Sequence, residues 1–413
     1  MNIILLNKWG LTSLPFASWW GPGAQIFMIC SPGAAASVTP ETLASTFAEV
    51  HVVEDYDSSP EVELLALEIA SRLPVHHVVA MSETDILRSA RLRGHIGVPG
   101  QGLESALAFR DKLVMKEALS CGGVPVARYV GVDDVVDLAR ARDLLGYPFV
   151  LKPRRGSSSV GIDVVGDDDE LRQVARHRLS SHDDMPAALL AEEFVPHDLF
   201  HVDGLVVCGH EPALWPSRMT NTLGFGAGAV LRSVTLDVSD QAVAPVVALT
   251  RSAIDALPTP DVSIVHAEIF HDHRDGRFFL NEIACRLGGG RIKASFKLSF
   301  GRDLLEEYCT RLVAESPDAP FHSVPTQQAG FILVPSREGT VAAVPSTGAP
   351  EGVAEVRCHV AVGDRIRPAG SSIDAMASAT AQAGTSAQVV RVLESVGAWF
   401  EDSLVVQDEE VAR

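Results

Sequence analysis

The sequence lacks any run of apolar residues long enough to cross a membrane. A membrane-spanning helix needs about 20 such residues, and no stretch of the chain approaches that length. The apolar run at residues 3–6 is also too short for a signal peptide, and predicts a first β-strand instead. We therefore expect a soluble protein of the cytoplasm.

Cysteine pairs and positive charge are also scarce. The six cysteines are scattered, with no CxxC pair and no zinc-like spacing, which is typical of reduced thiols. The chain has 34 Lys and Arg against 53 Asp and Glu, a formal net charge of −19. This charge argues against nucleic acid or an anionic membrane as the main partner, because neither would be attracted to it.

The pattern of apolar residues divides the 413-residue chain into three parts. In the first hundred residues, short β-rich runs alternate with helical spacing, which predicts a small parallel α/β unit. A Gly-rich segment at 97–102 ends it, and a helix is expected at Glu104–Leu119. Near the C-terminus, Val-rich runs precede a helix at Ser386–Phe400, for which Thr385 or Ser386 can serve as N-cap.

A pair of carboxylates is the strongest chemical signal. Residues 265–270 and 279–284 both read as strands, and a polar turn joins them. A hairpin centred on Asp275 would place Glu268 opposite Glu282 on one face, where two like charges repel. Magnesium prefers carboxylate oxygen and would hold such a pair together. The alternative is a solvated outer face.

A lysine followed by a Gly/Ser-rich loop is the second signal. Lys152 ends an apolar strand, and residues 154–161 contain several backbone and hydroxyl donors. Glycine lets amides approach phosphate oxygens, and the lysine adds a compact positive charge. The order of a Walker P-loop is absent, so we expect a hairpin that closes like a lid; a surface linker is the alternative.

A third strand, residues 189–195, is apolar and ends in two acids and an aromatic residue. Adenine could lie against such a segment and pair with its main chain. Many core strands also end in acidic residues, so this signal has little specificity alone.

Taken in order along the chain, these elements resemble the ATP-grasp superfamily, and most of all its L-amino-acid (dipeptide) ligases. The resemblance rests on Asp111–Lys116 followed by Gly123-Val124-Pro125, on Lys152 and its loop, on residues 192–195, on the two glutamates, and on Glu282–Arg286 followed by Gly288–Gly290. It implies an α/β fold, α+β in parts, with three domains. These are an N-terminal parallel α/β domain (1–108), a central ATP-grasp domain (109–326) with a mobile lid at about 125–191, and a β-rich C-terminal α+β domain (327–413).

The resemblance also implies a set of site residues for ATP and Mg²⁺, with Mn²⁺ as an alternative ion. Arg286 would be the catalytic residue, facing the transferred phosphoryl group or the carboxylate; a structural salt bridge is its other interpretation. The metal would be held by Glu268 and Glu282. The nucleotide would be bound by Lys112, Lys152, Gly156, Ser157, Ser158, Glu192, Glu193, Phe194, Val195 and His201.

Two positions depart from the family pattern. Ala284 stands where many members have a metal-binding asparagine, and Leu199 where many have a ribose-binding glutamate. His201 shares a face with Leu199 by strand alternation. It is therefore the candidate to replace the lost ribose contact, with a core histidine as the alternative.

The implied activity is an ATP-dependent carboxylate–amine ligase acting on small, amino-acid-like substrates. The reaction would form an acyl phosphate and release ADP and phosphate. One alternative keeps this chemistry but transfers the acyl group to a thiol of a carrier protein or coenzyme A. Another is an inactive nucleotide-binding module, against which both glutamates and both lysines argue. The resemblance also allows a homodimer.

Overall fold

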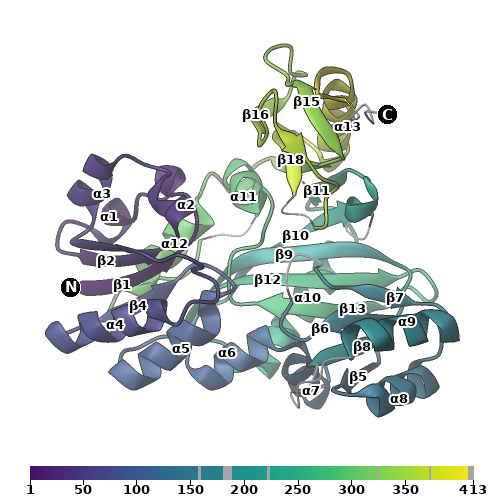
Figure 1. Cartoon of the computed structure of the whole chain (residues 1–413), viewed down its shortest axis with the longest axis horizontal. Coiled ribbons are helices and arrows are strands. Elements are labelled where there is room, and N and C mark those ends of the chain that lie inside the picture. The colour runs from purple at the N-terminus through teal and green to yellow at the C-terminus, as the bar shows by residue number, and fades with distance from the viewer. Residues whose placement is uncertain are drawn as a thin grey trace, which may run out of the picture.

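The computed structural model of the chain describes residues 1–156, 160–179, 188–220, 224–315, 317–321, 324–371 and 374–407. Its strands form four sheets, arranged as three neighbouring bodies (Figure 1). Within these residues, no helix combines the length and the apolar composition needed to span a bilayer.

The N-terminal body contains the parallel sheet that the sequence predicts. Its strands run in the order β3-β2-β1-β4, and all of its pairs are parallel. Ile3 and Leu5 pack on one face of β1, whereas Ile4 and Leu6 pack on the other. Because both faces are buried, the strand reads as a continuous apolar run. The elements are β1 (Asn2–Asn7), η1 (Leu11–Ser13), α1 (Phe16–Trp20), β2 (Gln25–Cys30), α2 (Pro32–Ala35), α3 (Pro40–Thr46), β3 (Glu49–Val52), α4 (Glu61–Arg72), β4 (His77–Ala80) and α5 (Asp85–Ile96).

The helix expected at Glu104–Leu119 is two helices, α6 (Leu103–Arg110) and α7 (Lys112–Cys121). Asp111 separates them, because its backbone is extended and its side chain accepts hydrogen bonds from the amides of Leu113 and Val114. An N-cap aspartate starts a new helix in this way. The single-helix prediction was wrong because apolar periodicity does not register one capping residue.

A small antiparallel sheet follows, in the order β5-β8-β6-β7. Two helices, α8 and α9, pack against it. The elements are β5 (Tyr129–Val132), α8 (Val135–Leu145), β6 (Phe149–Pro153), β7 (Asp163–Val165), α9 (Asp168–Arg178) and β8 (Leu189–Glu193). This sheet lies within the predicted lid and carries Lys152 at the end of β6.

The largest sheet has eight strands in the order β13-β12-β9-β10-β11-β14-β18-β16. Its strands are β9 (His197–Val207), β10 (Ala213–Thr220), β11 (Leu231–Thr235), β12 (Val262–Asp272), β13 (Phe278–Ala284), β14 (Gln328–Pro335), β16 (Val353–Cys358) and β18 (Ala375–Ala383). The accompanying helices are η2 (Phe225–Ala227), α10 (Val243–Ala256), α11 (Ile292–Phe300), α12 (Leu304–Leu312) and α13 (Ser386–Ser403).

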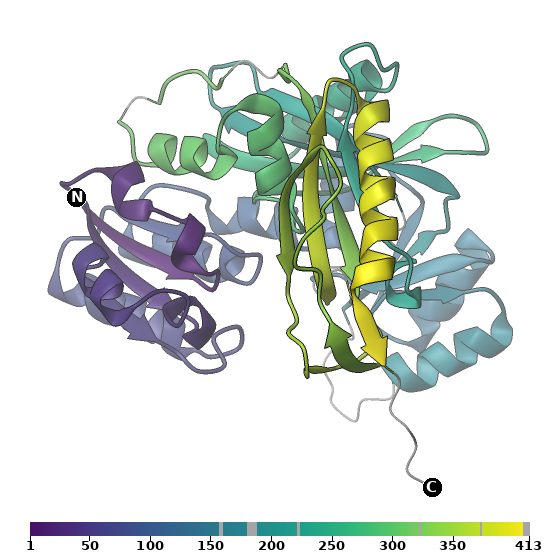
Figure 2. The ribbon, with the colours of Figure 1, turned by 90° about the horizontal axis from the view of Figure 1, so that it is seen from above.

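The C-terminal segment is continuous with this large sheet, since β14 pairs antiparallel with β11. A further small sheet joins β17 (Arg365–Ile366), β15 (Gly339–Ala343) and β19 (Val405–Gln407). Helix α13 lies along the C-terminal strands (Figure 2), and Thr385 begins it with a capping box. The predicted division at 326/327 therefore falls within a continuous sheet, and the three-domain division stays a prediction.

Candidate active site

A cavity of about 590 Å³ lies between the N-terminal body, the small antiparallel sheet and the large sheet. It brings together six residues that the sequence singles out, from four separate parts of the chain: Lys112, Lys152, Gly156, Glu268, Glu282 and Arg286. Residues of the N-terminal body, among them Glu83, complete the wall. Ser157 and Ser158 lie outside the described residues.

The two glutamates occupy the positions that the hairpin argument predicts. Glu268 on β12 is the register partner of Glu282 on β13. The register shifts between Glu268 and Ile269, so that Ile269 pairs with Leu280 and Asn281 is the extra residue. A bulge of this kind re-aims a side chain. Asn281 consequently lines the cavity, and its Nδ2 donates to Glu268 Oε2 at 3.0 Å.

Positive charge surrounds one of the two carboxylates. Lys112 Nζ lies 3.1 Å from Glu282 Oε1 and also donates to the carbonyl of Gly156. Burial by itself would raise the pKa of Glu282, but the charges of Lys112, Lys152 and Arg286 outweigh it and lower the pKa to about 2. Glu282 is therefore ionised at neutral pH, as a metal ligand needs to be.

Lys152 belongs to a buried chain of polar contacts. Its Nζ lies 3.0 Å from Glu192 Oε1 and donates to Asn281 Oδ1 at 3.3 Å. Lys116 approaches the same Glu192 oxygen, at 3.2 Å. Burial lowers the pKa of Lys116, and the attraction of both lysines keeps the pKa of Glu192 low in spite of its burial. Sequence reasoning missed Lys116, although it lies one helical turn after Lys112 and so shares a face with it.

The segment expected to hold adenine, residues 192–195, does not line this cavity as far as the described residues go. The carboxylate of Glu192 faces two lysines, and Glu193 forms ion pairs with Arg128 and Arg274. Phe194 donates its amide to the carbonyl of Pro148, and the Val195 carbonyl contacts the His197 ring. Their assignment to adenine stays a prediction.

Arg286 lines the cavity and is also part of a salt bridge. Its Nε contacts Glu83 Oε2, and the other oxygen of Glu83 lies 3.2 Å from Arg110. Burial opposes the charge of Arg286, but Glu83 outweighs it and raises the arginine pKa. Sequence reasoning missed Glu83, which precedes α5 in a turn and carries no local motif.

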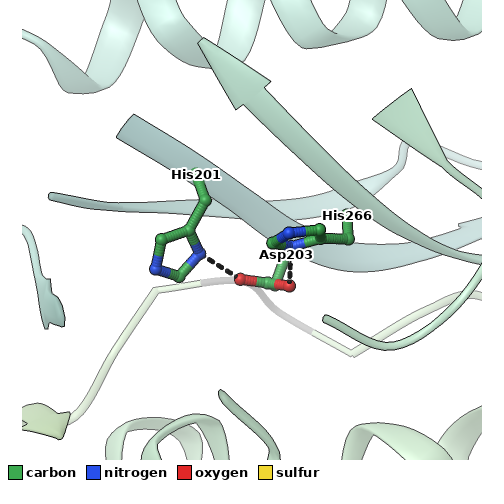
Figure 3. A group of neighbouring side chains, drawn as sticks. All are labelled: His201, Asp203 and His266. Carbon is green, nitrogen blue, oxygen red and sulfur yellow. Dashed lines mark hydrogen bonds and ion pairs between the residues drawn. The ribbon is translucent and has the colours of Figure 1, made fainter. Parts of the chain in front are cut away.

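Figure 3 shows a buried aspartate held between two histidines. Asp203 Oδ2 lies 2.6 Å from His201 Nδ1, and Asp203 Oδ1 lies 2.9 Å from His266 Nδ1. Burial alone would raise the pKa of Asp203, but both histidines outweigh it and hold the pKa well below its usual range. Burial alone would lower the pKa of His266, but the charge of Asp203 outweighs burial and raises this pKa. Sequence reasoning missed both Asp203 and His266.

His266 connects this group to the cavity, since it lines the wall and its Nε2 lies 3.9 Å from Glu268. His201 points the other way, with its Nε2 2.6 Å from Ser233 Oγ. Both of its ring nitrogens are engaged and it does not line the cavity, so its assignment to the ribose stays a prediction. Leu199 is buried, while Ala284 lines the cavity.

The ligand atoms of His201, Asp203 and His266 are close enough together to consider a metal ion. Hydrogen bonds of 2.6 and 2.9 Å between them already account for the arrangement. The space beside them is only about 10 Å³, roughly that of a single water molecule. We therefore read this group as a hydrogen-bonded network.

Comparison with known proteins identifies the central part of the chain. Residues 117–288 match the family model described as "ATP-grasp domain". The "L-arginine-specific L-amino acid ligase" of Bacillus subtilis is 29% identical over 294 residues, covering 71% of this chain and 70% of its own length. The "Alanine--anticapsin ligase" of Bacillus subtilis (strain 168) is 24% identical over 324 residues, covering 71% of this chain and 67% of its own length.

The fold agrees with these matches. The crystal structure of an L-amino acid ligase from Bacillus licheniformis superimposes with a TM-score of 0.77 at 16% identity, over 99% of both chains. The expected ATP-grasp fold, with a parallel N-terminal sheet and a large antiparallel sheet, is confirmed.

Proposed function

We propose that this chain, which contains an ATP-grasp domain and is similar to amino acid ligases, joins the carboxylate of one amino-acid-like molecule to the amine of another. The observation that carries the proposal is the cavity itself. Paired carboxylates, two lysines and an arginine from separate parts of the chain face one space. The names of the two ligase relatives support amino acids as substrates.

An amine does not displace oxygen from a carboxylate anion at a useful rate, because the oxide ion is a poor leaving group. We propose that a carboxylate oxygen first attacks the γ-phosphorus of ATP, so that ADP leaves and an acyl phosphate forms. The amine then attacks the acyl carbon, phosphate leaves, and the nitrogen loses a proton. In such a reaction the protein mostly positions groups and stabilises charge.

The residues present fit Mg²⁺, because Glu268 and Glu282 are register partners and Glu282 has a lowered pKa. A bound Mg²⁺ would neutralise charge on the β- and γ-phosphate oxygens. Asn281 supports Glu268 through the hydrogen bond from its Nδ2, so the bulge also orients one of the two carboxylates.

We assign the phosphates to Lys112 and Lys152, both of which line the cavity. Lys116 would support them through Glu192, which it shares with Lys152. Arg286 would bind the transferred phosphoryl group or the carboxylate, because its planar set of donors suits both. To do so it would exchange part of its contact with Glu83.

The test is to identify the nucleotide product. The purified chain is incubated with ATP, Mg²⁺ and a pooled set of amino acids and small carboxylates, and ADP is resolved from AMP. We expect ADP and phosphate whose release depends on the pool, together with an amide product detectable by mass spectrometry. AMP with pyrophosphate would overturn the acyl-phosphate route. A product found only with thiol acceptors would overturn the amine as acceptor.

A further inference from the structure

Part of the cavity lining is chemically unlike the charged groups around the glutamates. Four of its apolar side chains belong to the large sheet, and we call them the apolar wall: Met219, Leu231, Phe331 and Leu333. They lie on β10, β11 and β14, which are neighbours in the large sheet. Leu231 is the register partner of Leu333, and Ser233 is the partner of both Met219 and Phe331. Alternation along the strands therefore puts all four on one face.

The apolar wall lies on the same face of the large sheet as Glu268. Strand β9 separates β12, which carries Glu268, from β10. Neighbouring strands lie about 4.8 Å apart, and the registers place Met219 opposite Phe270, two residues along β12 from Glu268, so the backbones of Met219 and Glu268 are roughly 12 Å apart. An amino acid whose carboxyl group lay near the paired glutamates would extend its side chain toward these residues.

The charges around the cavity disfavour a cationic side chain beside the apolar wall. Glu83 is paired with Arg110 and Arg286, and Glu282 with Lys112. Apart from Glu268, which belongs to the proposed metal site, the described residues that line the cavity include no other carboxylate. Two further lysines, Lys8 and Lys293, line the same cavity, each paired with an aspartate outside the lining, Asp57 and Asp303. A guanidinium or ammonium group beside the apolar wall would therefore find no free acidic partner among the described lining residues.

We propose that the apolar wall is the side-chain subsite for one of the two substrates, and that it selects an amino acid with a large apolar side chain, such as leucine, methionine or phenylalanine. This inference rests on the proposed function and adds the substrate class. Burying such a side chain removes apolar surface from water on both partners. Burying a charged side chain without a partner carries a large desolvation penalty. The subsite therefore favours apolar side chains and rejects arginine, the substrate named for the relative from Bacillus subtilis.

The experiment measures substrate-dependent ADP release by the full chain with ATP and Mg²⁺. Leucine, methionine and phenylalanine are compared with alanine, arginine, lysine and glutamate, singly and in pairs. We expect kcat/KM for the large apolar amino acids to exceed that for alanine by about tenfold or more, as is usual when a pocket discriminates by apolar contact. ADP release that prefers arginine, lysine or glutamate would overturn the subsite while leaving the ligase function intact. ADP release with no amino acid at all would overturn the proposed function, and the subsite with it.

A variant of the half-buried Met219 tests the wall directly. In Met219→Glu, a carboxylate enters the apolar wall, and we expect the ratio of kcat/KM for leucine to that for arginine to fall by about tenfold or more. Met219→Ser removes apolar surface without adding charge and should lower the ratio in the same direction. Val238→Glu adds the same charge at a position that is 60% exposed, outside the cavity lining, and serves as the matched control. Thermal melting confirms that each variant is folded. An unchanged ratio in both Met219 variants would overturn the inference.

Discussion

Glu268 and Glu282 lie opposite each other on neighbouring strands, yet they have different partners. Lys112 contacts Glu282, whereas Glu268 receives a hydrogen bond from Asn281. Two carboxylates at such a spacing repel each other, and a divalent cation would remove that repulsion. The difference in their partners makes Glu282 the better first target for mutation.

Replacing Glu282 with glutamine should nearly abolish turnover and should leave the fold intact. The amide keeps the size of the side chain but loses the charge that a metal ion requires. We expect kcat to fall by about a hundredfold or more, equivalent to roughly 2.7 kcal/mol of transition-state stabilisation. The rate of ADP release at saturating ATP and Mg²⁺ measures this change in kcat. Glu338→Gln, at an exposed position, is the control, and equal rates in the two variants would remove Glu282 from the metal site.

Replacing Lys152 with methionine should weaken ATP binding. A hydrogen bond to a charged group contributes about 1.5–3 kcal/mol, so we expect Kd for ATP to rise by about tenfold or more. Folding should persist, because Lys116 still pairs with Glu192. Calorimetric titration with ATP and Mg²⁺ measures the change, with Lys297→Met at an exposed position as the control. An unchanged Kd would show that Lys152 has only a structural role.

Replacing Asp203 with asparagine should destabilise the protein in a pH-dependent way. The low pKa of Asp203 gives stability that is present above the ordinary carboxyl pKa of about 4 and lost as pH falls through the folded-state pKa. The raised pKa of His266 gives stability that is present below about 6.5 and lost as pH rises through its folded-state value. The two contributions overlap most fully between about pH 4 and pH 6.5.

We expect Asp203→Asn to lower the free energy of unfolding by about 1–3 kcal/mol within that window, because a buried hydrogen-bonded charge is lost. The difference from the natural chain should narrow at higher pH, as His266 becomes neutral. Urea denaturation of both proteins at pH 5.5 and pH 8.5 measures this difference in the free energy of unfolding. A difference that grows with pH would contradict the ion-pair assignment.

Adding a single methyl group at Gly288 should disturb the cavity wall. A Cβ there would lie 2.5 Å from Ile292 Cδ1 and 2.6 Å from His266 Nδ1. Because His266 is held by Asp203, it cannot move without breaking that bond. We expect Gly288→Ala to lower the free energy of unfolding by about 1–3 kcal/mol, as overpacking usually does. At Gly289 the added atom would meet nothing within 4 Å, so Gly289→Ala should change stability much less under the same denaturation.

Local patterns in the sequence were sufficient for the elements that local physics controls. The run of four apolar residues at 3–6 predicted a first β-strand, and the structure confirms it as β1. Alternation about a polar turn predicted the pairing of Glu268 with Glu282, because side chains two residues apart share a face. The residues before the last long helix offered Thr385 or Ser386 as its N-cap, since capping depends on residues within one turn, and the structure shows Thr385 in that role.

What the sequence by itself determined was therefore the order of the elements and the pair of carboxylates at the centre of the cavity. The tertiary structure alone decided the partners of those groups. Glu83 and Arg286 lie 203 positions apart, and Lys112 and Glu282 lie 170 apart. No periodic pattern links residues across such separations, because their contact depends on how three bodies pack. The bulge that turns Asn281 toward Glu268, and the burial that fixes Asp203 between two histidines, are likewise properties of the packed sheet.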